Sequence, residues 1–282
     1  MLKIQSKKTE SLSFYRTEHE FERYAEFSAI EEFQEYRHWA IENNVSLYIL
    51  GNGSNTLFGR RKVKSLVLKN MMPKKIEVVS KYEAWVSSSV LTIEVLKHCY
   101  KNSLDSFYYL ASVPATIGGA LAMNAGRGRG HNLTIYDFVE KVEFFDFNDD
   151  CVKTLGKQEI IRGYRETIFT GTQSSFLILS AMFKFEELAI EGNPVADRCR
   201  WSKENQDYSA PNCGSVFKEA DMSILNALKG LRIGNTSFSK KTRNWILNDS
   251  KSPIPILLLI SASKIIHFIK RKKVASEVII VK

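Results

Sequence analysis

The sequence predicts an α+β fold with a larger N-terminal domain followed by a smaller C-terminal α+β domain. Stretches with apolar residues at helical spacing alternate with short apolar runs that suit strands. A polar stretch from 187 to 207 then separates this pattern from a final region of loop, helix and short strand. The chain has 282 residues, 44% of them hydrophobic, so it can form two domains of roughly 100–200 residues. We expect a first domain over 1–190, divided near residue 70, and a second over 191–282.

Hydrophobic periodicity places the individual elements. It predicts helices over 29–43 and 93–101, and a buried strand over 45–50 that runs directly into a glycine loop. The apolar run 254–261 is far shorter than the ~20 residues of a membrane helix, and it predicts a buried helix face. Further strands are expected at 65–68, 75–79, 85–88, 142–147, 176–185 and 277–281.

The formal net charge of +9 predicts an anionic partner, which could be nucleic acid, an acidic membrane surface or a phosphate-bearing small molecule. The cations cluster only at 60–62 and 270–273, and the second cluster is expected just after a helix C-terminus, where cations complement the helix dipole. Neither cluster is interleaved with aromatic residues in a nucleic-acid-binding pattern. We therefore expect neither a nucleic acid nor a membrane partner.

The cysteines form no CxxC pair, so the sequence predicts no zinc site, no redox dithiol and no other metal site. They are expected to be reduced thiols in a cytoplasm. The N-terminus lacks the apolar core of a signal peptide, which also favours a cytoplasmic protein. The four cysteines are Cys99, Cys151, Cys199 and Cys213.

Two glycine-rich segments are candidates for ligand binding. The loop 51–55, Gly-Asn-Gly-Ser-Asn, could bind phosphate through converging backbone N–H groups, although it lacks the spacing of a Rossmann turn or a P-loop. In the segment 112–126, a Val-Pro step and paired glycines predict a tight turn that opens a short helix. Taken alone, the first loop could be a structural turn. Two such loops in one domain favour a long ligand such as a dinucleotide, held at two points.

Three side chains are candidates for chemistry, and each has a structural alternative. Ser215 follows a glycine at a predicted turn, where its hydroxyl could donate a proton or simply belong to an ordinary turn. Arg165 could pair with a carboxylate or phosphate, or it could be a surface arginine. Glu277 begins an apolar strand, where burial would raise its pKa and suit it to proton transfer. The alternative for Glu277 is a gatekeeper charge at a strand edge.

Read together, six segments in order resemble the motifs of the UDP-N-acetylenolpyruvoylglucosamine reductase (UDP-N-acetylmuramate dehydrogenase) family. They span about residues 45 to 281, and the compact span 163–213 resembles the shorter subclass of that family. The segments are Leu50-Gly-Asn-Gly-Ser-Asn55, Val113-Pro-Ala-Thr-Ile-Gly-Gly-Ala120 with Met123-Asn-Ala-Gly126, Gly163-Tyr-Arg165, Gly214-Ser-Val-Phe-Lys218, Gly230-Leu-Arg-Ile-Gly234 and Glu277-Val278.

The resemblance implies a flavoprotein oxidoreductase of peptidoglycan synthesis, and so of cell wall biogenesis, cell shape and cell division. It implies a PCMH-type FAD-binding domain of two subdomains followed by a substrate-binding domain. It also implies NADPH as reductant, a UDP-sugar substrate, and a monomer or weak dimer. Ser215 would protonate the substrate, while Arg165 and Glu277 would stabilise the enolate-like intermediate. Tyr164 and Lys218 would bind substrate. The residues implied to bind FAD are Gly51, Asn52, Gly53, Ser54, Asn55, Pro114, Thr116, Gly118, Gly119, Asn124, Ala125 and Gly126.

The chain departs from the family pattern at four places. Residues 11–16 stand where an Asn-Thr segment is usual, and Ala115 replaces a glycine. Glu219-Ala220 replaces Asn-Pro, and Ser276 replaces a proline. A flavin-dependent oxidoreductase of the same fold therefore remains an alternative. It would act on a different nucleotide sugar or oxidise a small alcohol or sugar.

Overall fold

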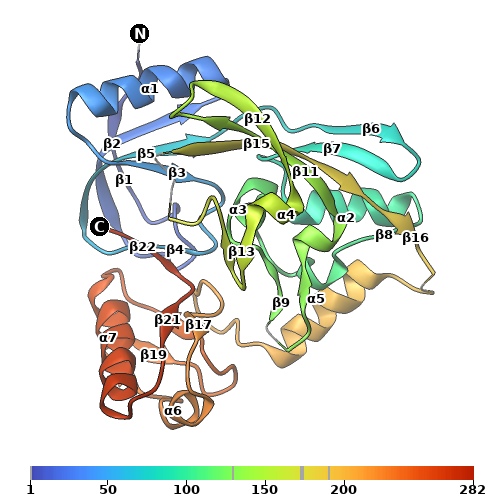
Figure 1. Cartoon of the computed structure of the whole chain (residues 1–282). Helices are drawn as coiled ribbons and strands as arrows, with labels where there is room; N and C mark the ends of the chain where they lie inside the picture. The colour runs from blue at the N-terminus through green and yellow to red at the C-terminus, as the bar shows by residue number, and fades with distance from the viewer. Residues whose placement is uncertain (1, 129, 172–174, 190) are drawn as a thin grey trace. The chain divides into compact units, whose positions relative to one another are not determined.

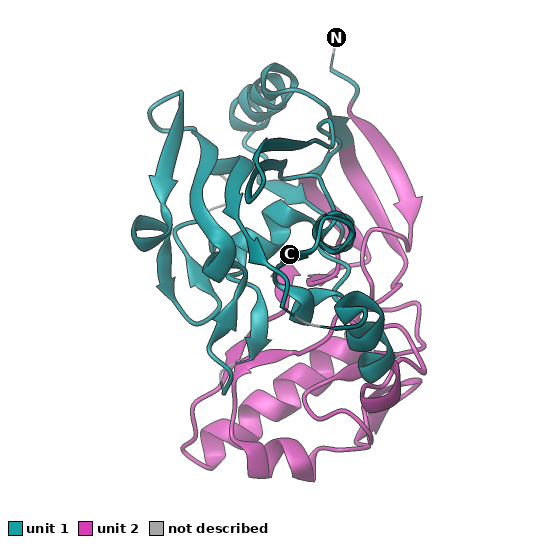
Figure 2. Ribbon diagram, turned by 90° about the vertical axis from the view of Figure 1, so that its right-hand side faces the viewer, with its two compact units in different colours: residues 1–3, 25–52, 67–202 teal, residues 4–24, 53–66, 203–282 magenta. Residues whose placement is uncertain are grey.

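The computed structural model describes residues 2–128, 130–171, 175–189 and 191–282. The chain has the predicted α+β composition and forms two compact units, each built from separate stretches of sequence (Figure 2). Unit 1 contains residues 1–3, 25–52 and 67–202, and unit 2 contains residues 4–24, 53–66 and 203–282. These units divide the chain differently from the boundaries expected near 70 and 190, which stay predictions for the FAD-binding and substrate domains.

One strand pairing within unit 2 explains part of this difference. Strand β22, Ile279–Val281, pairs in parallel with β4, Thr56–Phe58. The last strand therefore pairs with a strand that lies more than 200 residues earlier in the sequence. Local sequence patterns report burial of one segment but not its distant partner, so this pairing could not be read from periodicity.

A five-stranded antiparallel sheet forms the centre of unit 1 (Figure 1). Its order is β12-β11-β15-β7-β6, and the four strands predicted between 75 and 185 are all in it. The strands are β6 Ile76–Ser80, β7 Glu83–Ser87, β11 Val139–Asp146, β12 Cys151–Gly156 and β15 Phe176–Lys184.

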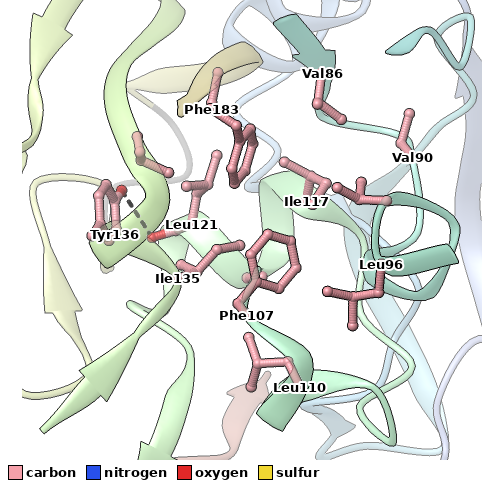
Figure 3. Packing of buried hydrophobic residues seen from close by; sticks show 14 of the residues in the cluster. Val86, Val90, Leu96, Phe107, Leu110, Ile117, Leu121, Ile135, Tyr136 and Phe183 are labelled. Carbon is pink, nitrogen blue, oxygen red and sulfur yellow. Dashed lines mark hydrogen bonds between the residues drawn. The ribbon is translucent and has the colours of Figure 1, made fainter. Parts of the chain in front are cut away.

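The hydrophobic core of unit 1 lies between this sheet and the helices that pack on it. Figure 3 shows Val86 and Phe183 from the sheet meeting Leu96, Phe107 and residues of the second glycine segment. Alternate residues of a strand point to opposite faces, which is why the apolar members of these strands reach one core. Inside it the hydroxyl of Tyr136 donates to the carbonyl of Leu121 at 3.1 Å.

The remaining elements of unit 1 are short. The predicted helices at 29–43 and 93–101 are present as α1 and α2. The set comprises α1 Ile30–Glu42, β3 Leu47–Leu50, α2 Thr92–Lys101, β8 Leu104–Asp105, η1 Tyr108–Leu110, α3 Ile117–Ala122, β9 Gly126–Gly128, β10 Leu133–Thr134, η2 Ile135–Phe138, α4 Lys157–Ile160, β13 Ile161–Gly163, β14 Glu166–Thr167 and β16 Glu186–Glu187.

Three elements run from one unit into the other along the chain. They are β2 His19–Phe27, β5 Lys62–Asn70 and α5 Pro194–Asn205. The two strands belong to a sheet of order β1-β2-β5-β3. Helix α5 lies within the stretch expected to be polar linker. Only Val195 and Ser202 of its residues are buried, too few to give a visible helical period.

Unit 2 combines short strands with two helices, and α7 contacts α6, β18 and β19. The buried helix face expected at 254–261 is present in α7, which continues to Ile269. The cations at 270–273 do follow its C-terminus. The elements of unit 2 not yet given are β1 Gln5–Thr9, β17 Phe217–Glu219, α6 Met222–Ala227, β18 Arg232–Ile233, β19 Thr236–Phe238, β20 Ile246–Asn248, α7 Ile254–Ile269 and β21 Ala275–Ser276.

Candidate active site

Within unit 1, the two glycine-rich segments lie against each other. The side-chain amide of Asn52 donates to the carbonyl of Pro114 at 2.7 Å. A Cβ atom on Gly51 would lie 2.8 Å from the Thr116 hydroxyl oxygen, so only glycine allows this approach without displacement. The Lys69 ammonium donates to the Gly51 carbonyl. The structure thus brings the start of the first loop onto the second.

Within unit 2, the rest of the first loop is held by residues near the N-terminus. Gly53 has a φ of 74°, and a Cβ there would lie 2.2 Å from the Leu12 carbonyl oxygen. The Phe14 N–H donates to the Gly53 carbonyl at 3.2 Å, and the Ser13 hydroxyl donates to the Thr56 carbonyl at 2.5 Å. The segment that departs from the family pattern therefore fixes this loop.

Three backbone carbonyls of the loop 51–55 accept hydrogen bonds from the protein, whereas its backbone N–H groups are available to bind a ligand. Its carbonyls at Gly51, Gly53 and Asn55 accept from Lys69, Phe14 and Ile279. Within the described part of the chain, none of the five N–H groups donates to a protein acceptor. Adjacent free N–H groups on small residues form an anion-binding surface, so the loop fits the diphosphate of a dinucleotide.

The short helix predicted in the second glycine segment is present as α3, but its start is not a free anion site. Thr116 caps α3 by accepting from the Gly119 N–H at 3.2 Å. The N–H groups of Ile117 and Gly118 donate to carbonyls of unit 1 at 2.8 and 2.9 Å. A Cβ on Gly118 would lie 2.9 Å from that of Ser88. Close packing against Ser88 therefore explains why residue 118 is a glycine. The contacts of Gly118 and Gly119 with FAD remain predictions.

Arg165 holds the end of the second segment by its guanidinium fork. Its Nη1 donates to the Asn124 carbonyl at 2.9 Å and its Nη2 to the Gly126 carbonyl at 2.8 Å. Its side chain is buried, with 9% of the residue exposed, and the guanidinium carbon lies 5.2 Å from the Tyr164 ring centroid. Sequence reasoning directed this fork to a substrate carboxylate. The structure uses two of its donors to shape the loop that contains Ala125.

Asn124 offers a buried acceptor beside this fork. Its side-chain nitrogen donates to the Gly163 carbonyl at 3.0 Å. Its Oδ1 is buried and has no hydrogen-bond partner among the described residues. A buried polar atom is costly to leave unpaired, so a ligand N–H donor would satisfy it. A flavin ring carries N–H donors of the kind that this acceptor would take.

Within unit 2, the segment that contains Ser215 is hydrogen-bonded to the segment that contains Glu277. The N–H groups of Glu277 and Val278 donate to the Val216 carbonyl at 2.8 and 3.3 Å. Val216 and Val278 are buried in the core of unit 2, while Ser215 and Glu277 are half-buried. The Asn55 side chain donates to the Glu277 carbonyl at 3.0 Å. Hydrogen bonds therefore join the first loop to the segment of Glu277, and that segment to the one that contains Ser215.

Asn244 was missed by sequence reasoning, yet it fixes the residues after Ser215. Its Oδ1 accepts from the Phe217 N–H at 3.0 Å, its Nδ2 donates to the Phe217 carbonyl at 2.8 Å, and its own carbonyl accepts from the Val216 N–H at 2.9 Å. Its φ is 67°, a conformation that asparagine tolerates better than most residues. In the sequence, the only sign of this role was an asparagine, a residue common in turns, directly before the apolar run 245–247.

Three further residues near Ser215 in the sequence have side chains that could take part in binding or catalysis: Cys213, Lys218 and Glu219. Cys213 is buried, and burial raises the pKa of its thiol to about 12, so it is not a thiolate nucleophile at neutral pH. Lys218 is half-buried in β17. Beside it, Glu219 pairs with Ala275 of β21.

Among the described residues no group of three His, Cys, Asp or Glu could hold a metal ion, and no helix there is long and apolar enough to cross a membrane.

Comparison with known proteins gives a consistent result. Residues 22–155 match the FAD binding domain family. The chain is 30% identical over 233 residues to UDP-N-acetylenolpyruvoylglucosamine reductase of Aquifex aeolicus, covering 80% of this chain and 76% of that protein. It is 31% identical over 246 residues to the Francisella tularensis enzyme of the same name, covering 82% of each.

The fold is also shared with a solved structure. That of the Thermus caldophilus UDP-N-acetylenolpyruvylglucosamine reductase matches with a TM-score of 0.77 at 20% identity, over 99% of this chain and all of that one. The identities and coverage of the two curated relatives exceed what the fold alone would give. The chain therefore belongs to the UDP-N-acetylenolpyruvoylglucosamine reductase family.

Proposed function

We propose that this protein is an FAD-dependent reductase that uses NADPH to convert UDP-N-acetylglucosamine enolpyruvate to UDP-N-acetylmuramate in peptidoglycan synthesis. Membership of the family supports the reaction. The observation that carries the proposal is the hydrogen bond from the Glu277 N–H to the carbonyl of Val216, the residue after Ser215, together with the bond from the Asn55 side chain to the Glu277 carbonyl. The flavin-dependent alternative acting on another substrate has in its favour only the departures of this chain from the family pattern, such as Ala115 and Glu219-Ala220.

The residues that would hold FAD are the free N–H groups of the loop 51–55 and the buried acceptor of Asn124. When bound, FAD supplies the hydride, obtained from NADPH, that reduces the enolpyruvyl β-carbon. The net charge of +9 favours binding of a diphosphate cofactor and a UDP-sugar. Because both NADPH and nucleotide sugars are cytoplasmic metabolites, we place the reaction in the cytoplasm.

The proposed chemistry of the protein side chains follows from the electronic demand of the reaction. Addition of hydride to an alkene conjugated with a carboxylate leaves negative charge on the α-carbon and carboxylate. The Ser215 hydroxyl gives its proton to the α-carbon and is reprotonated from solvent. Glu277, in its protonated form, donates a hydrogen bond to the developing charge. Arg165 contributes positive charge, and through its fork it sets the shape of the loop 124–126.

Replacement of Ser215 by alanine tests this assignment. The purified protein should be yellow, and flavin absorbance should report the two half-reactions separately. Loss of a general acid should slow flavin reoxidation by the enolpyruvyl substrate by about 10²–10⁴-fold, with flavin reduction by NADPH unchanged. Ser261→Ala, at an exposed serine of α7, is the matched control. Equal loss in both half-reactions would make Ser215 structural, and a colourless protein that FAD cannot reconstitute would refute the flavoenzyme assignment.

A further inference from the structure

Helix α7 of unit 2 has two apolar faces, of which the fold uses one. The residues buried on the first face are Ile256, Leu259, Ile260, Ser263 and His267. The helix contacts α6, β18 and β19, and Figure 1 shows it beside β19. His267 fixes it further, because its Nε2 accepts from the Asp221 N–H at 3.0 Å and its Nδ1 bonds to the Ser263 carbonyl at 2.8 Å. The helix is thus firmly held on one side.

The second apolar face is exposed. Its members are Ile254 at 60% exposure, Leu258 at 48%, Ile265 at 58%, Phe268 at 83% and Ile269 at 68%. At 3.6 residues per turn, these five positions fall within an arc of about 100°, opposite the buried face. We call them the α7 stripe. Contiguous apolar surface of this kind marks an interaction site more often than scattered exposed residues do.

Exposed cations follow the α7 stripe directly. Lys270, Arg271 and Lys273 are exposed, whereas Lys272 pairs with Asp221 at 3.6 Å. Lys264 is exposed on the helix itself. An exposed apolar helix face next to a cluster of basic residues is the pattern of helices that lie in the interface of anionic membranes. The apolar side chains enter the acyl boundary while the cations meet the lipid phosphates.

The size and charge of this surface favour a membrane over a second copy of the chain. The α7 stripe offers several hundred Å², below the roughly 800 Å² per partner of a stable dimer. Self-association would also bring together two chains of net charge +9, whereas an anionic bilayer attracts that charge. We propose that unit 2 binds the surface of anionic phospholipid membranes through the α7 stripe and the cations at 270–273. This differs from the expectation of no membrane partner, which considered the pattern of the cations and whether the apolar run could span a membrane.

Vesicle co-sedimentation of the full-length protein tests the proposal, with vesicles of phosphatidylcholine alone or mixed equally with phosphatidylglycerol. The protein should bind the mixed vesicles and bind pure phosphatidylcholine weakly. Phe268→Ser with Ile269→Ser should weaken binding more than tenfold. Lys270→Gln with Lys273→Gln should weaken it by about 30-fold at low salt and much less at high salt.

Two double variants serve as matched controls. Val78→Ser with Val79→Ser removes two apolar residues of β6 that are 58% and 54% exposed. Lys75→Gln with Lys97→Gln removes two exposed cations of unit 1. Both should bind vesicles like the unaltered protein, and circular dichroism should show all four variants folded. Equal weakening by test and control variants would overturn the proposal. So would a solution dimer that Phe268→Ser with Ile269→Ser dissociates, because the occupant of the stripe would then be a second copy.

Discussion

Replacement of Gly53 by alanine should destabilise the protein by about 3 kcal/mol. The left-handed conformation at φ 74° costs a residue with a Cβ about 1–2 kcal/mol. The added Cβ would also lie 2.2 Å from the Leu12 carbonyl oxygen, so the backbone must move. That movement strains or breaks the 3.2 Å bond from Phe14 to the Gly53 carbonyl, which contributes about 0.5–1.5 kcal/mol.

Gly234 is the matched control, because a side chain there would meet the cost of the left-handed conformation without a steric clash. Its φ is 56°, and a Cβ there would meet no heavy atom within 4 Å. Gly234→Ala should therefore cost only the conformational part, about 1–2 kcal/mol. Urea unfolding of the FAD-free protein measures both free energies without a contribution from cofactor binding. Equal losses for the two variants would refute the close approach of Leu12 as the reason for glycine at this position.

Three further results are expected. Asn244→Ala should lower turnover by slowing the reoxidation half-reaction, because Ser215 loses its support, while FAD content stays normal; unchanged half-reactions would leave Asn244 with a folding role only. Arg165→Lys should lower FAD occupancy, measured by the ratio of flavin to protein absorbance, since an ammonium cannot bridge two carbonyls as a fork does. A thiol reagent at pH 8 should label Cys151, which is exposed, but not Cys213, whose pKa burial raises to about 12; rapid labelling of Cys213 would contradict its burial.

The sequence predicted those parts of the fold whose burial leaves a local period. Helix α1 buries Phe33, Tyr36 and Ala40, and this spacing is visible without the structure. The partners of Asn244 were not predictable in the same way, because its hydrogen bonds to Phe217 join residues 27 positions apart. The apolar residues of α7 gave a third outcome. Their number was visible in the sequence, but a helix that is apolar on two sides does not reveal which side the fold covers.

The loop that Arg165 supports shows why residue type alone does not assign a role. Asn124 and Arg165 both have positive φ, at 45° and 59°, and such conformations cost of order 1–3 kcal/mol each unless the surroundings hold them. Asn124 bonds to the carbonyl of Gly163, and Arg165 bonds to the carbonyl of Asn124, so the two segments stabilise each other. A buried guanidinium must satisfy its donors first, and here main-chain carbonyls take two of them. Whatever charge Arg165 offers a substrate therefore depends on a loop that Arg165 itself holds in place.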